Sequence, residues 1–250
     1  MIDSGYYALL AGYGTALVGW VIINRLYPSL WPIQDFISFK HPWREVGWSL
    51  LAVLGIIAIG QLYQQGIRLP ADGAFGPLFD AINQAVIFSP LFVLLYARTQ
   101  SLDTAWLSLH RMGGRVAAGL GLALVSILVY TAIREESGSW LQVVSNVYHP
   151  QNFSHLVQVF LEDIGIAILF IRFRAAVGRR AAIGLVAVLF AAGHIPALLA
   201  EGAALSELTS LILDAGLLVG ALTIIQRSSD ILWIWCVHFA MDMMQFYAVP

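Results

Sequence analysis

Eight stretches of about 20 mostly apolar residues run through this 250-residue chain, and each is long enough to cross a bilayer as a helix. Hydrophobic residues make up 59% of the chain and charged residues only 11%, whereas soluble domains carry about 25% charged residues. We therefore predict an all-α, polytopic membrane helix bundle of about eight transmembrane helices, forming a single membrane domain over residues 1–250. The predicted spans are 5–24, 47–66, 77–97, 115–133, 154–171, 181–200, 207–225 and 231–249.

The basic residues are distributed unevenly between the loops that join these spans. When the loops are assigned alternately to two sides, 11 of the 13 basic residues fall on one side, and loops rich in Lys and Arg are usually cytoplasmic. The sequence therefore predicts an integral protein of a bacterial or archaeal inner membrane, with both termini outside. The basic residues of the predicted cytoplasmic side are Arg25, Lys40, Arg44, Arg98, Arg111, Arg115, Arg172, Arg174, Arg179, Arg180 and Arg227.

The composition also limits the kinds of binding partner that we expect. A net charge of −2 argues against nucleic acid, which is bound through a basic face. The single cysteine, Cys236, cannot form an internal disulfide. The lipid bilayer is therefore the first partner that we expect.

Six acidic or histidine side chains lie well inside the last four predicted spans, at least six residues from either end, and a charge at the bilayer centre costs about 2.5–3.5 kcal/mol. Such residues usually face the interior of a bundle, where they pair with another polar group or have a functional role. Some only hydrogen-bond a neighbouring helix. At a rise of about 1.5 Å per residue, Glu162, His194 and His238 lie about 9–16 Å from the outer ends of their spans. We therefore expect this acid and these imidazoles to meet in one wet cavity. The six residues are Glu162, Asp163, His194, Asp214, His238 and Asp242.

Spacing within the helices indicates which of these side chains share a face. His238 and Asp242 are four residues apart, and residues at this spacing lie on the same face of a helix. Phe190 and His194 have the same spacing, so the phenylalanine either supports the imidazole ring or is an ordinary core residue. Adjacent residues point about 100° apart. Of Glu162 and Asp163, at most one should therefore face the site squarely.

This set of side chains suits two kinds of chemistry. A divalent metal such as zinc could be held by Glu162, His194, His238 and Asp242, because zinc takes imidazole nitrogen and carboxylate oxygen. Without a metal, Glu162 and His194 could polarise a water as general base while His238 helps to hold an oxyanion. Both routes support hydrolysis of an amide or ester inside the membrane. The sequence contains neither an H-E-x-x-H zinc helix nor a G-x-S-x-G nucleophile elbow.

The order and spacing of three short motifs resemble those of the CPBP family of intramembrane proteases (CAAX proteases and bacteriocin-processing enzymes, also called the Abi family). The resemblance implies that residues 154–249 form the family's core and that the protein is an intramembrane endopeptidase. It further implies that Glu162 and His194 activate water, and that the substrate is a prenylated or hydrophobic peptide or a lipidated protein. The three motifs are Glu162-Asp163, Phe190-Ala-Ala-Gly-His194 and His238-Phe-Ala-Met-Asp242.

The chain departs from the family pattern at three positions. The first motif is usually E-E-x-x-x-R, whereas this chain has Asp163 at the second acid and Ala167 in place of the arginine. Asp242 replaces the commoner asparagine, and an ionised aspartate cannot donate a hydrogen bond. Asp242 could instead orient His238, ligate a metal, or donate if it is protonated. The divergent first motif leaves open a non-catalytic family member that acts as a membrane adaptor or immunity factor. Acidic residues inside the membrane also suit an ion path, so a less favoured alternative is an ion-coupled transporter that uses Asp214 and Asp242.

Overall fold

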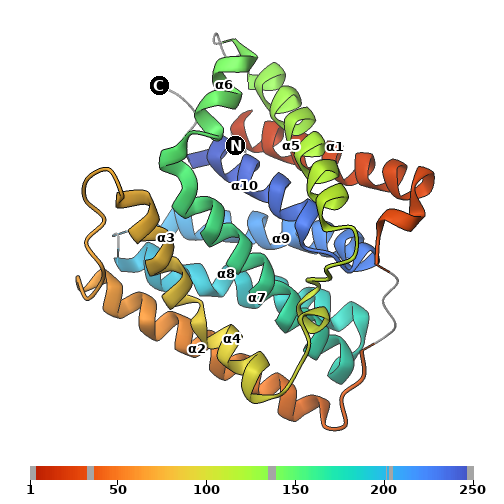
Figure 1. Cartoon of the computed structure of the whole chain (residues 1–250), viewed down its shortest axis with the longest axis vertical. Coiled ribbons are helices and arrows are strands. Elements are labelled where there is room, and N and C mark those ends of the chain that lie inside the picture. The colour runs from red at the N-terminus through yellow and green to blue at the C-terminus, as the bar shows by residue number, and fades with distance from the viewer. Residues whose placement is uncertain (1–3, 33–36, 135–138, 201, 203–204, 247–250) are drawn as a thin grey trace.

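The computed structural model of the chain describes residues 4–32, 37–134, 139–200, 202 and 205–246, and within them every regular element is helical. Short 3₁₀ helices cover Pro28–Leu30, Leu102–Ala105 and Pro150–Asn152. The prediction of an all-α helix bundle is therefore confirmed (Figure 1). The α-helices are α1 Ser4–Leu26, α2 Pro42–Gln64, α3 Gly76–Ile87, α4 Ser89–Ala97, α5 Met112–Arg134, α6 Trp140–Val147, α7 Phe153–Val177, α8 Arg179–Ala200, α9 Leu205–Ser228 and α10 Leu232–Phe246.

Each predicted span overlaps a helix, but the number of helices that qualify as spans is smaller than expected. Five helices, α1, α2, α5, α8 and α9, are long and apolar enough to cross a membrane. A sixth span results if α3 and α4, which are bent by 44° relative to each other, are counted as one. The two remaining predicted spans are α7 and α10, which lie inside the bundle with most of their residues buried. The end of the predicted span 231–249, from residue 247 onward, lies outside the described residues.

The break between α3 and α4 has a local cause. Pro90 occupies the first turn of α4, where its missing backbone N–H is tolerated. The same proline also packs closely against α2, since a Cβ added at Gly55 would lie 3.1 Å from its ring. The third predicted span is therefore two short helices rather than one straight helix.

The outer surface of the bundle is apolar in a way that suits lipid. In α2, only 17% of the most apolar stretch is buried inside the protein, and the side chains of Leu51 and Leu54 are more than half exposed. Soluble monomers rarely expose large continuous apolar patches. The chain is therefore an integral membrane protein.

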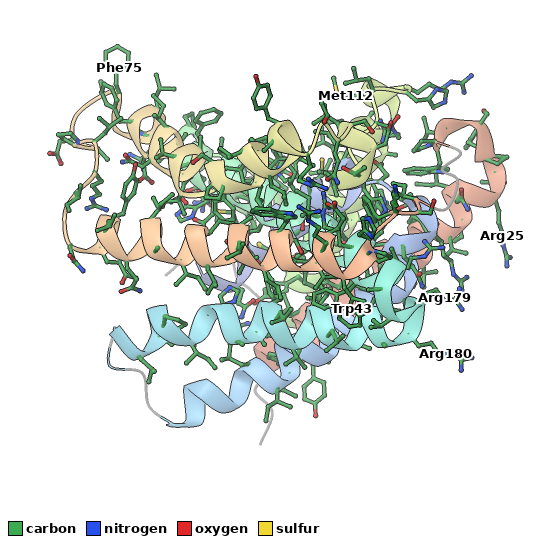
Figure 2. All side chains as sticks on the ribbon, turned by 90° about the horizontal axis from the view of Figure 1, so that it is seen from below. Arg25, Trp43, Phe75, Met112, Arg179 and Arg180 are labelled. Atoms are coloured by element: carbon green, nitrogen blue, oxygen red, sulfur yellow. The ribbon has the colours of Figure 1, made fainter. Side chains whose placement is uncertain are left out.

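Two loops that the alternating assignment places on the same side contact each other. His110 Nε2 lies 3.2 Å from the carbonyl oxygen of Ser29, and Arg111 donates a hydrogen bond of 2.9 Å to the Ser29 hydroxyl. At the opposite end of the bundle from Phe75, Figure 2 shows three of the basic side chains, Arg25, Arg179 and Arg180. These contacts agree with spans of alternating direction. Which side is cytoplasmic, and with it the position of the termini, stays a prediction.

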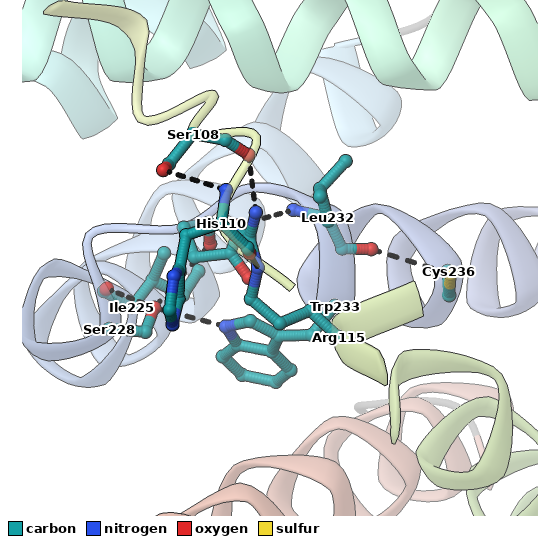
Figure 3. Close-up of polar contacts among 9 residues, drawn as sticks. Ser108, His110, Arg115, Ile225, Ser228, Leu232, Trp233 and Cys236 are labelled. Atoms are coloured by element: carbon teal, nitrogen blue, oxygen red, sulfur yellow. Dashed lines mark hydrogen bonds and ion pairs between the residues drawn. The ribbon is translucent and has the colours of Figure 1, made fainter. Parts of the chain in front are cut away.

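At this basic end of the bundle, a buried ion pair joins α5 to the turn before α10 (Figure 3). The Arg115 guanidinium pairs with Asp230, and both side chains are fully buried. Arg115 also donates to the carbonyl oxygens of Ser108 and His110. Asp230 accepts a further hydrogen bond from the backbone N–H of Leu232. Burial raises the pKa of the Asp230 carboxyl to about 6, although Arg115 acts in the opposite direction.

α5 and α10 approach each other closely at Gly119. A Cβ at this position would lie 2.7 Å from the backbone of Trp233, which cannot move aside as a side chain can. We therefore expect Gly119→Ala to lower the free energy of unfolding by about 1–3 kcal/mol. Gly121→Ala is the matched control, since nothing lies within 4 Å of its Cβ. Thermal unfolding in detergent measures both variants, and equal midpoints would contradict the close packing.

Candidate functional site

A cavity of about 160 Å³ lies between α1, α7, α8, α9 and α10. Its wall includes every ionisable residue that stood out in the last four predicted spans. The structure thus brings one acid pair, two imidazoles and two further carboxylates to one chamber. The ionisable residues of this chamber, called the polar cavity below, are Glu162, Asp163, His194, Asp214, His238 and Asp242.

His238 lies between two carboxylates in the polar cavity. Its Nδ1 is 3.0 Å from Asp163 Oδ1, and its Nε2 is 3.6 Å from Asp242 Oδ1. Because an ionised carboxylate only accepts hydrogen bonds, the Nδ1–H of the ring donates to Asp163. Asp163, expected to be secondary, therefore orients His238, and Asp242 faces the other ring nitrogen as its spacing predicted.

Glu162 and Asp163 both line the polar cavity, although their adjacent positions predicted that at most one of them would face the site squarely. The reason is the position of α7, which other helices surround on several sides. Asp163 points toward His238 of α10, whereas Glu162 also reaches a second cavity on the side of α2 and α8. Two residues about 100° apart can therefore both serve one site.

Glu162 has a hydrogen-bond partner that none of the sequence motifs includes. Gln158, one turn earlier in α7, donates from Nε2 to Glu162 Oε1 at 2.9 Å. The four-residue spacing is visible in the sequence, but a neutral amide inside an apolar run attracts less notice than a charge. Gln158 holds the carboxylate of Glu162 in one orientation.

His194 is fixed by its own helix. Its Nδ1 lies 2.9 Å from the carbonyl oxygen of Phe190, and the two rings are 4.7 Å apart at an angle of 60°. Phe190 therefore supports the imidazole. A carbonyl oxygen can only accept, so Nδ1 carries the proton and a neutral ring keeps Nε2 as an acceptor. His194 is an exposed residue and lines two cavities.

The second cavity, of about 360 Å³, lies between α2, α3, α7 and α8, and is called the apolar groove below. Leu50, Val53 and Ile57 line it along α2, and glutamine side chains line it toward the other end of that helix. Glu162 and His194 belong to both cavities, together with Ile166 and Phe190. The acid and one imidazole thus form the boundary between a polar chamber and an apolar groove.

Helix α1 contributes tyrosines that no sequence motif singled out. The Tyr6 hydroxyl donates to Asp214 Oδ1 at 2.8 Å. Tyr13, two turns further along, lines the polar cavity and is 8% exposed. A tyrosine in a membrane helix carries no signal of its own, and only the packing of α1 beside α9 and α10 brings these two to the site.

The positions of the cavity side chains bear on the predicted metal centre. Within the part of the chain that the structure describes, no group of three or more His, Cys, Asp or Glu side chains is arranged to hold a metal ion. Both ring nitrogens of His238 face carboxylates instead of a point shared with His194. Zinc at Glu162, His194, His238 and Asp242 stays a prediction, which elemental analysis of the purified protein would test.

No family model matches this chain, and no curated protein or solved structure matches it either. The resemblance to the CPBP family therefore depends on the three motifs and their order along the chain.

Proposed function

We propose that the protein is an intramembrane endopeptidase that hydrolyses a peptide bond of a hydrophobic or prenylated segment. The observation that carries this proposal is the boundary between the two cavities, where Glu162 and His194 face both the apolar groove and the polar cavity. A hydrophobic chain lying in the groove would present its backbone to an acid and an imidazole. Water has a polar chamber on the other side of the same two residues.

The arrangement supports a role for each side chain. The Glu162 carboxylate, oriented by Gln158, takes a proton from water as the water oxygen adds to the scissile carbonyl carbon. His194 presents Nε2 to the same water, because its Nδ1–H is hydrogen-bonded to the carbonyl oxygen of Phe190. His238, held between Asp163 and Asp242, places a second imidazole in the wall of the polar cavity.

The proposal is tested by reconstituting the full chain in liposomes with a panel of internally quenched hydrophobic peptides, each made with and without a prenylated cysteine. We expect cleavage at a defined bond in at least one peptide, identified by mass spectrometry of the products. Asp80→Asn is a suitable control, because Asp80 lies in α3 and lines neither cavity. Folded protein that leaves every peptide of the panel intact would contradict the proposal.

A further inference from the structure

Hydrolysis of an amide needs a hydrogen-bond donor for the carbonyl oxygen, which becomes an oxyanion when water adds to the carbon. Most donors of the polar cavity are already engaged. The Nδ1–H of His238 donates to Asp163, and that of His194 donates to the Phe190 carbonyl. The cavity carboxylates accept hydrogen bonds when ionised. Within the three motifs, only Nε2 of His238 is left as a possible donor, and it faces Asp242 at 3.6 Å. A donor outside the motifs would therefore add to what His238 can offer the oxyanion.

Tyr13 provides such a donor. Its side chain is buried in the wall of the polar cavity, and the residues that the structure describes give its hydroxyl no hydrogen-bond partner. The phenol shares the polar cavity with the carboxylates of Glu162 and Asp242. A neutral phenol donates one hydrogen bond, and its ordinary pKa of about 10 keeps it neutral at pH 7.

One other donor outside the three motifs lines the same cavity among the described residues. Gln245 lies near the described end of α10, and its side chain is exposed rather than buried. A donor that water surrounds contributes less to an oxyanion than one held in a dry site, because water competes for the same hydrogen bond. The buried phenol is therefore the better placed of the two.

We propose that Tyr13 is a catalytic residue that donates a hydrogen bond to the oxyanion of the tetrahedral intermediate. The assignment rests on the proposed peptidase function. As the water oxygen bonds to the carbonyl carbon, the π electron pair moves to the carbonyl oxygen and Glu162 takes the proton. The Tyr13 O–H binds that oxygen and keeps its own proton. The intermediate then re-forms the carbonyl, the C–N bond breaks, and the proton passes from Glu162 to the leaving amine.

The test is Tyr13→Phe, which keeps the packed ring and removes only the hydroxyl. We expect kcat on a cleaved peptide to fall about 10²–10³-fold, with little change in KM because the contact forms only in the transition state. Tyr7→Phe is the matched control, since Tyr7 is a neighbouring tyrosine of α1 that is 57% exposed and lines neither cavity. Equal thermal midpoints for the two variants show that both are folded.

A second measurement separates this inference from the proposed function. A phosphonate analogue of the cleaved peptide mimics the tetrahedral oxyanion, and its Kd should rise by a similar factor in Tyr13→Phe, while the Kd of an uncleavable substrate analogue stays unchanged. A wild-type protein that cleaves and a Tyr13→Phe variant with normal kcat would overturn the role of Tyr13 alone. A fall in kcat found only in Gln245→Ala would transfer the role to that amide. Absence of cleavage by the wild type would overturn both proposals.

Discussion

Replacing Glu162 by Gln is expected to lower the rate of peptide cleavage by about 10²–10⁴-fold. The amide has nearly the same size as the carboxylate and can still hydrogen-bond Gln158, but it cannot take a proton from water. KM should change little, because the side chain acts on the water and not on the apolar part of the substrate. Initial rates in liposomes, at saturating and at low peptide concentration, measure both quantities.

Asp80→Asn also replaces a carboxylate by an amide, but Asp80 lies in α3 and lines neither cavity. This variant should therefore cleave the peptide at the wild-type rate. His194→Ala tests the same boundary from α8 and should also be impaired. Full activity in Glu162→Gln would remove the acid from the mechanism, whatever its position between the two cavities.

Much of the fold could be predicted from the sequence, because the hydrocarbon core of a bilayer permits few backbone structures. A backbone in hydrocarbon must satisfy its own hydrogen bonds, so a long apolar run becomes a helix. The runs at residues 5–24 and 115–133 therefore correspond closely to α1 and α5. The bend between α3 and α4 was not predicted, and neither were the buried positions of α7 and α10. Both depend on how the helices pack together, and apolarity alone does not distinguish a helix that faces lipid from one that faces other helices.

The candidate site could be predicted in part for a related reason. A charge inside an apolar run is costly, so Glu162 and His238 stand out in the amino-acid sequence by themselves. Gln158 and Tyr13 do not stand out, because neutral polar side chains are common in membrane helices. The orientation of Asp163 was also beyond prediction, since it depends on which helix lies on each side of α7. The spacing of residues within one helix was informative, whereas contacts between helices could not be inferred from it.

The largest loss of stability is expected from Arg115→Met, which leaves the Asp230 carboxylate buried without its cation. Removing one partner of a buried ion pair costs about 3–5 kcal/mol of the free energy of unfolding. The double variant Arg115→Met with Asp230→Leu should be less destabilised, because neither charge then remains buried alone. It should still lie below the wild type, since the carbonyl groups of Ser108 and His110 lose their donor. Unfolding in detergent measures all three proteins, and equal losses in the single and double variants would contradict the argument.

The dependence on pH distinguishes this explanation from simple loss of packing. Burial raises the pKa of Asp230 to about 6 in the folded wild type, and an unfolded aspartate has a pKa of about 3.9. The folded state therefore binds more protons between these values, so the contribution of this group to stability increases as the pH falls through the folded pKa. Arg115 lowers that pKa, so its loss moves the transition to higher pH. The deficit of Arg115→Met should consequently shrink between pH 8 and pH 5. The deficit of the double variant should instead grow over the same range, because the wild type gains stability from protonation of Asp230 and the double variant has no carboxylate there to titrate.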